Sequence, residues 1–129
     1  MQIIEVLGRM FLSALFLIEG FNKIFYYEET IQYMENFDVA EYLAIPAIIL
    51  EILFPLLLII GYQTKIAALV IALFTIVVAI IFHTNFDDHM QFITFFKDIA
   101  IAGGFIIIFV NGAGKFSVDY KLKSNKTNA

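Results

Sequence analysis

Residues 42–82 read YLAIPAIILEILFPLLLIIGYQTKIAALVIALFTIVVAIIF. The stretch holds two apolar runs, 42–61 and 66–82, which are joined by a short polar turn. Each run approaches the roughly 20 residues that a helix needs to cross about 30 Å of hydrocarbon. The runs are unbroken rather than alternating, which favours helices over the strands of a membrane barrel. The stretch therefore predicts an antiparallel helical hairpin in a membrane.

Two further apolar runs, 8–26 and 92–110, flank this hairpin. Hydrophobic residues make up 61% of the chain and charged residues 16%, which leaves too few polar side chains to cover a water-soluble core. No convincing cleavage site follows the first run, so we expect it to be retained as a span rather than removed as a signal. The sequence thus predicts an all-α fold, a membrane four-helix bundle over residues 1–120, with the lipid bilayer as its first partner.

Several classes of site are disfavoured by composition. The chain has no cysteine, which excludes disulfides, thiolate catalysis, iron–sulfur clusters and covalent c-type haem. The net charge is −4 and no basic stripe with interleaved aromatics occurs, so we expect no nucleic-acid partner. His83, Asp87, Asp88 and His89 lie close together but lack a recognised ligand spacing, so we expect no metal site.

The distribution of charge predicts the orientation in the membrane. Residues 24–41 and 84–96 contain acidic residues and no Lys or Arg. The basic residues outside the runs and near the start are Arg9, Lys65, Lys115, Lys121, Lys123 and Lys126. The positive-inside rule then places both termini in the cytoplasm. We expect residues 121–129 to be a disordered polar cytoplasmic tail, and residues 28–41 to contain a short surface helix.

Ionisable residues inside or at the ends of the apolar runs are the best indicator of a functional site. They are Glu19, Lys23, Glu51, His83, Lys97 and Asp98. Carboxylates are costly in hydrocarbon, so they should turn inward and pair with basic side chains. At 1.5 Å per residue, all six fall within roughly 15 Å of depth on four helices. We therefore predict one buried polar pocket for a ligand, open toward the outside.

The pairing inside this group allows two interpretations. Glu19 and Lys23 have the spacing of a helical ion pair, whereas Glu51 has no basic residue within one turn. Glu51 must then be protonated or pair with a lysine of another helix, for which we expect Lys97. In the alternative, Glu19–Lys23 and Lys97–Asp98 are local pairs that serve only packing or reach the membrane surface.

Several segments together resemble the DoxX family of small bacterial membrane proteins, over residues 8–120. The segments that carry the resemblance are LFLIEGFNK (15–23), PLLLIIGYQTK (55–65), FHTNF (82–86), FFKDIAIAGG (95–104) and GAGKFSVD (112–119), together with Arg9 and Glu51. The family usually has Lys-Asn where this chain has Lys97-Asp98, so the role of that Asn is not carried over.

The resemblance implies a four-helix protein of the bacterial inner membrane. Namesakes of the family are tied to a thiosulfate:quinone oxidoreductase, which implies a subunit of, or accessory to, a quinone-linked redox system. The chain shows no redox cofactor ligands of its own, so the implied cofactor is a non-covalent quinone and the implied partner a redox subunit. Lys23 or Lys97 would then hydrogen-bond a quinone carbonyl, and Glu51 or Glu19 would exchange the proton.

Two other functions remain open at this point. A glutamate in the middle of the first run also fits a small proton-coupled transporter, and the charged group could equally specify helix packing in a non-catalytic assembly protein. Any enzymatic role would be as part of an oxidoreductase complex rather than as a self-contained enzyme. A homo-oligomer is compatible with each of these functions.

Overall fold

The computed structural model describes residues 2–112 and 117–128, and within them it consists of helices and connecting turns with no strand. The elements are α1 (Gln2–Phe25), α2 (Tyr27–Asn36), the 3-10 turn η1 (Glu41–Leu43), α3 (Ala44–Ile60), α4 (Thr64–Phe82), α5 (His89–Asn111) and α6 (Val118–Asn128). The four predicted apolar runs correspond to α1, α3, α4 and α5, and the short helix expected within 28–41 corresponds to α2.

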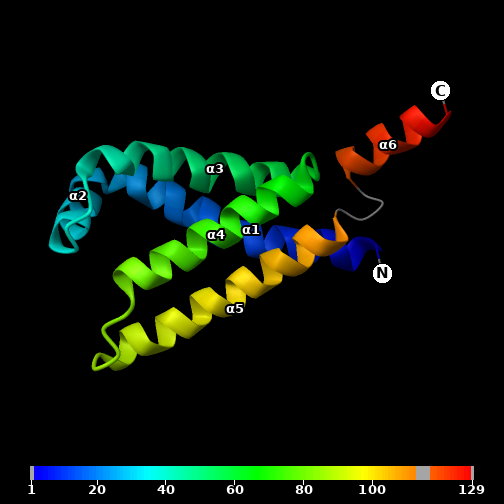
Figure 1. Ribbon diagram of the computed structural model, residues 1–129. Helices are drawn as coiled ribbons and strands as arrows, with labels where there is room; N and C mark the ends of the chain where they lie inside the picture. The colour runs from blue at the N-terminus through cyan, green and yellow to red at the C-terminus, as the bar shows by residue number, and fades with distance from the viewer. Residues whose placement is uncertain (1, 113–116, 129) are drawn as a thin grey trace.

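The four long helices form one antiparallel bundle. α1 packs beside α3, α3 beside α4, and α4 beside α5 (Figure 1). One end of the bundle carries α2 and the α4–α5 connection, and we call it the α2 end. The start of α1 and helix α6 lie at the opposite end, which we call the α6 end. The predicted all-α membrane helical bundle is thereby confirmed.

Within the described residues, three helical segments are long and apolar enough to cross a membrane. They are Glu41–Ile60, Thr64–Phe82 and His89–Asn111. Helix α1 has the length, with 24 residues, but it carries four charged residues: Glu5, Arg9, Glu19 and Lys23. Of the four predicted spans, three are therefore supported by the length and composition of their helices. The charges of α1 need protein partners if this helix also crosses the hydrocarbon.

Buried residues on α1 and α3 follow the same seven-residue pattern. On α1 they are Arg9, Ser13, Phe16 and Gly20. On α3 they are Ala44, Ile48, Glu51, Pro55 and Leu58. Steps of four and three residues alternate in both sets, which is the spacing of helices that interlock along a narrow seam. The α1–α3 contact includes charged residues and extends from Arg9 and Leu58 at one end to Lys23 and Glu51 at the other.

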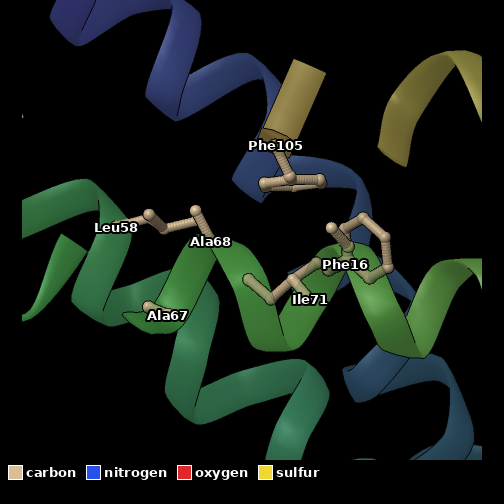
Figure 2. Close-up of a cluster of buried hydrophobic side chains, with 7 residues drawn as sticks. Phe16, Leu58, Ala67, Ala68, Ile71 and Phe105 are labelled. Atoms are coloured by element: carbon tan, nitrogen blue, oxygen red, sulfur yellow. The ribbon is translucent and has the colours of Figure 1, made fainter. Parts of the chain in front are cut away.

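The apolar core lies where all four long helices meet (Figure 2). Phe16 of α1 and Phe105 of α5 make an edge-to-face contact, with ring centroids 5.5 Å apart. Leu58 of α3 and Ile71 of α4 fill the space beside them. The small residues Ala67, Ala68 and Ala72 of α4 are also fully or nearly fully buried, which permits close helix contact.

The turn between α3 and α4 confirms the predicted hairpin. Gly61 adopts a left-handed conformation with φ of 77°. The backbone N–H groups of Gly61 and Tyr62 both donate to the carbonyl oxygen of Leu57, at 2.8 and 2.9 Å. This arrangement satisfies the end of α3 and reverses the chain within a few residues.

The expectation that residues 121–129 are disordered is wrong for the described part of that segment. Residues up to Asn128 belong to helix α6. The hydroxyl of Ser117 accepts a hydrogen bond from the backbone N–H of Tyr120 at 3.1 Å. A serine in this position caps the first turn of a helix. Ser117 therefore indicates a helix, whereas the polar composition of the segment favours disorder. The expected closing motif 112–119 includes residues 113–116, which lie outside the described residues.

Candidate functional site

A buried ion pair joins the centre of α3 to α1. Glu51 is 2% exposed, and the Lys23 ammonium donates to both of its carboxylate oxygens at 2.7 Å. Gly20 permits the approach of the two helices, because a Cβ at that position would lie 2.8 Å from Cγ1 of Ile52. Lys23 follows Gly20 by three residues and therefore lies on the same face of α1.

The prediction that Glu51 pairs with a lysine of another helix is confirmed, but Lys97 as that lysine is wrong. Glu19 does not pair with Lys23 either, since the Lys23 ammonium pairs with Glu51. Glu19 precedes Gly20 by one residue and is turned about 100° around α1 from the face that contacts α3. Among the described residues, Glu19 and Lys97 form no ion pair.

A second pair joins α4 to α5 toward the α2 end. Nε2 of His83 lies 3.7 Å from Oδ2 of Asp98, and both side chains are 20% exposed. The alternative that Lys97 and Asp98 neutralise each other is wrong. Neighbouring residues on a helix point about 100° apart, so Asp98 turns toward α4 while Lys97 is exposed.

Glu19 lies between the two pairs. Its side chain is exposed, yet its carboxylate is close enough to interact electrostatically with both Glu51 and Asp98. Five of the six predicted residues therefore share one region of the bundle, and Lys97 stands apart from it. The region holds three carboxyl groups against one lysine and one histidine. Such a set can exchange protons and can donate hydrogen bonds from Lys23 and His83.

Aromatic side chains beside His83 were not anticipated from the sequence. Tyr33 of α2 stacks on Phe82 at the end of α4, with ring centroids 5.2 Å apart. Phe37, which follows α2, packs edge-on against the same ring at 5.0 Å. Helix α2 thus contacts the end of α4 next to the His83–Asp98 pair. Nothing in the acidic sequence around α2 marks this contact in advance.

A further polar cluster at the α6 end was also missed. Arg9 is 3% exposed, and its Nη1 donates to the carbonyl oxygen of Leu58 at 2.9 Å. A signal was present: Arg9 precedes Lys23 by fourteen residues, which is two seven-residue repeats on the same stripe of α1.

The first turn of α6 completes this cluster. The Asp119 carboxylate accepts hydrogen bonds from the backbone N–H groups of Gln63 and Thr64, each at 2.8 Å. The backbone N–H of Asp119 donates to the carbonyl oxygen of Gly61 at 2.8 Å. The start of α6 is therefore bound to the α3–α4 turn, and we call these contacts the clasp.

A cleft of about 240 Å³ lies between α1 and α5 at the α6 end. Its lining residues are Glu5, Gly8, Arg9, Leu12, Ile107, Ile108, Asn111 and Gly112. None of the six residues predicted to form a ligand pocket lines it. The predicted pocket formed by those six residues therefore remains a prediction, and the cleft is a separate feature.

Comparison with known proteins identifies relatives over most of the chain. The family model described as DoxX matches residues 4–84. "Inner membrane protein YqjF" of Escherichia coli strain K12 is 34% identical over 114 residues, which cover 88% of this chain and 88% of that protein. "Inner membrane protein YphA" of the same strain is 28% identical over 124 residues, with 91% and 89% covered. No solved structure matches the chain.

Proposed function

This chain belongs to the DoxX family, and on that premise we propose that it is an inner-membrane protein that serves as a subunit of, or accessory to, a quinone-linked redox system. The observation that carries the proposal is the grouping of Glu19 with the Lys23–Glu51 and His83–Asp98 pairs. Reduction or oxidation of a quinone moves two protons with two electrons. A proton-exchanging group inside the bundle suits that chemistry.

Each residue of the group has its own role in binding the quinone or in moving its protons. As an imidazolium, His83 donates a hydrogen bond from Nδ1 to a carbonyl oxygen of the ligand, while its Nε2 faces Asp98, which orients the ring. Lys23 is held by Glu51, so its positive charge stays at a fixed position in the bundle. Glu19, whose carboxylate lies near Glu51 and Asp98, takes up or releases the proton that the ligand exchanges. A bound quinone would supply the two-electron chemistry, and a partner subunit would supply or accept the electrons.

The aromatic contacts next to His83 support the same ligand class. The rings of Tyr33, Phe37 and Phe82 form a cluster of apolar faces, and Phe82 is adjacent to His83 in sequence. Planar aromatic ligands gain from contact with such faces in offset or edge-on arrangements. The donor set and these rings together fit a quinone headgroup at the α2 end.

The test is retention of quinone and of a partner by the purified protein. We expect protein extracted in mild detergent to retain quinone by native mass spectrometry, and His83→Gln to lose most of it. Lys97→Gln is the matched control, because Lys97 is exposed and close in sequence to Asp98 but forms no ion pair among the described residues. Wild-type protein that retains neither a quinone nor a second subunit would contradict the proposal.

A proton-coupled transporter is the second candidate, and the exposed carboxylate of Glu19 favours it. The carboxylate lies in the middle of a helix and next to two further acids, as a site that loads and releases protons requires. Reconstituted liposomes distinguish the two functions. Proton-coupled solute flux that Glu19→Gln abolishes would select the transporter, whereas quinone retention without flux would select the redox subunit.

A further inference from the structure

We propose that two copies of this chain pair in the membrane, with Glu19 of each copy against the partner's Lys97. The pairing goes beyond the redox role and holds or fails independently of it. Both side chains are exposed, and among the described residues neither forms an ion pair. Lys97 belongs to a segment that is long and apolar enough to cross a membrane, where an ammonium group without a counter-ion is costly. Each of the two groups therefore needs a partner of opposite charge.

Glu19 and Lys97 lie at the same height of the bundle. Leu12 of α1 packs over Gly104 of α5, because a Cβ on Gly104 would lie 3.3 Å from both terminal carbons of Leu12. The two helices run in opposite directions (Figure 1). Glu19 follows Leu12 by seven residues, and Lys97 precedes Gly104 by seven. Seven residues make almost two full turns, so both charges lie on the stripes that meet at Leu12 and Gly104, about 10 Å closer to the α2 end.

The two helices separate before they reach this height. In Figure 1, α1 and α5 diverge toward the α2 end. The stack of Tyr33 on Phe82 fixes α2 to the end of α4, and the ion pair between α4 and α5 fixes α5 to the same end. A movement of α5 toward α1 would have to break one of these contacts. Glu19 and Lys97 of one copy are therefore held apart, and both stay accessible to a neighbouring molecule.

A second copy supplies both missing charges at once. A two-fold rotation about the membrane normal leaves every residue at its own depth and can bring α1 of each copy beside α5 of the other. Because Glu19 and Lys97 share one depth, this rotation forms two identical ion pairs, as an interface between identical copies requires. Ala100, one turn from Lys97, is small and exposed, which permits the close approach of a partner helix. Charge complementarity and depth together favour a second copy as the partner.

The partner's Lys97 also balances the charge around Glu19. The Glu19 carboxylate lies near two further acids, Glu51 and Asp98. Release of a proton from Glu19 adds a negative charge to this group, and the ammonium of the partner's Lys97 compensates it. Binding of the quinone through His83 does not require the partner. The interface forms between folded copies, so the unfolding of separate copies in micelles does not report on it.

Exchange of the two charges between copies tests the proposal. Two versions of the full chain with different affinity tags are reconstituted together in liposomes, and the fraction of one version recovered with the other measures pairing. Glu19→Lys in both versions, or Lys97→Glu in both, places like charges at both contacts and should lower pairing at least about tenfold. Glu19→Lys in one version with Lys97→Glu in the other restores two contacts of opposite charge, so pairing should return. Glu28→Lys, an exposed position on α2, is the control and should leave pairing unchanged.

Crosslinking gives a second measurement inside the bilayer, because the chain has no cysteine of its own. Leu15 lies one turn before Glu19 and is exposed, as is Ala100 beside Lys97. A short thiol-reactive crosslinker should therefore join Leu15→Cys in one version to Ala100→Cys in the other. Ala14→Cys is the matched control, since Ala14 is also exposed but is turned about 100° from Leu15 around α1. It should give no such product.

Four outcomes would overturn the proposal. Three concern recovery: no second copy with the wild type, pairing that Glu19→Lys or Lys97→Glu leaves unchanged, and a mixture of the two variants that pairs no better than either alone. The fourth is equal crosslinking of Leu15→Cys and Ala14→Cys, or none of either. The crosslink requires no charge substitution, so it decides the question even where far-UV circular dichroism shows that a charge variant has unfolded.

Discussion

Lys23 and Glu51 are 28 residues apart in sequence, yet the single ammonium group donates to both carboxylate oxygens at 2.7 Å. Glu51 is almost completely buried. The contribution of this contact to stability therefore depends on the cost of leaving the carboxylate buried without the lysine. Breaking a buried ion pair from one side leaves an uncompensated charge and is strongly destabilising. The pair therefore links the stability of the bundle to two residues of the proposed site.

Replacing Lys23 and Lys97 in turn distinguishes their roles. Lys23→Met should lower the free energy of unfolding by about 3 kcal/mol, the lower end of the range for a broken buried pair, because Lys23 is partly exposed. Lys97→Met should change it by less than about 0.5 kcal/mol, as for other surface substitutions. Unfolding in mixed micelles, followed by circular dichroism, measures both values. Equal effects of the two substitutions would contradict the assignment of Lys23 as the partner.

The α3–α4 turn should tolerate no side chain at Gly61. The left-handed conformation alone costs an alanine about 1–2 kcal/mol, and its Cβ would collide with Ser117 and with the guanidinium of Arg9. Gly103→Ala is the control, since its Cβ has open space and alanine favours a helix by about 0.5–1 kcal/mol. We expect a lower unfolding midpoint for Gly61→Ala and an unchanged or higher one for Gly103→Ala. A stable Gly61→Ala variant would show that the contact between the turn and Ser117 is not formed.

The Asp119 carboxylate should protect the first amides of α4 from exchange. Asp119→Ala removes both of its hydrogen bonds to Gln63 and Thr64 and should cost about 1 kcal/mol, as the loss of a helix cap does. Hydrogen exchange at these two amides should become faster, while exchange in the middle of α4 stays unchanged. Asp87→Ala, in the exposed α4–α5 connection, serves as the comparison and should leave both regions as they are. Unaltered exchange at residues 63 and 64 in Asp119→Ala would rule out the clasp.

The fold could be predicted from the sequence because hydrocarbon imposes strong constraints on length and composition. The apolar runs at 42–61 and 66–82 differ from α3 and α4 by only a few residues. The burial of Glu51 was also predictable, since a carboxylate at the centre of such a run has to face protein. Its partner was not, because the choice between Lys23 and Lys97 depends on how each helix is rotated about its axis. That rotation is set by Gly20, whose close contact with Ile52 became visible only in the structure.

The α6 end was harder to predict for a different physical reason. Arg9 was interpreted as a cytoplasmic charge, although it shares the seven-residue stripe of Ser13 and Phe16 and is buried with them. The role of Asp119 depends on contacts with Gln63 and Thr64, more than fifty residues away in sequence, which leave no local pattern. The cleft likewise depends on the distance between α1 and α5, which no periodicity specifies.

The most direct test of the account is an exchange of the two charges between α1 and α3. Lys23→Glu and Glu51→Lys each place like charges together in the bundle, so each should unfold at much lower denaturant than the wild type. The double variant restores opposite charges at the same two positions, and we expect it to recover more than half of the lost stability. A double variant that is as unstable as the two single losses combined would contradict the claim that Lys23 and Glu51 pair inside the bundle.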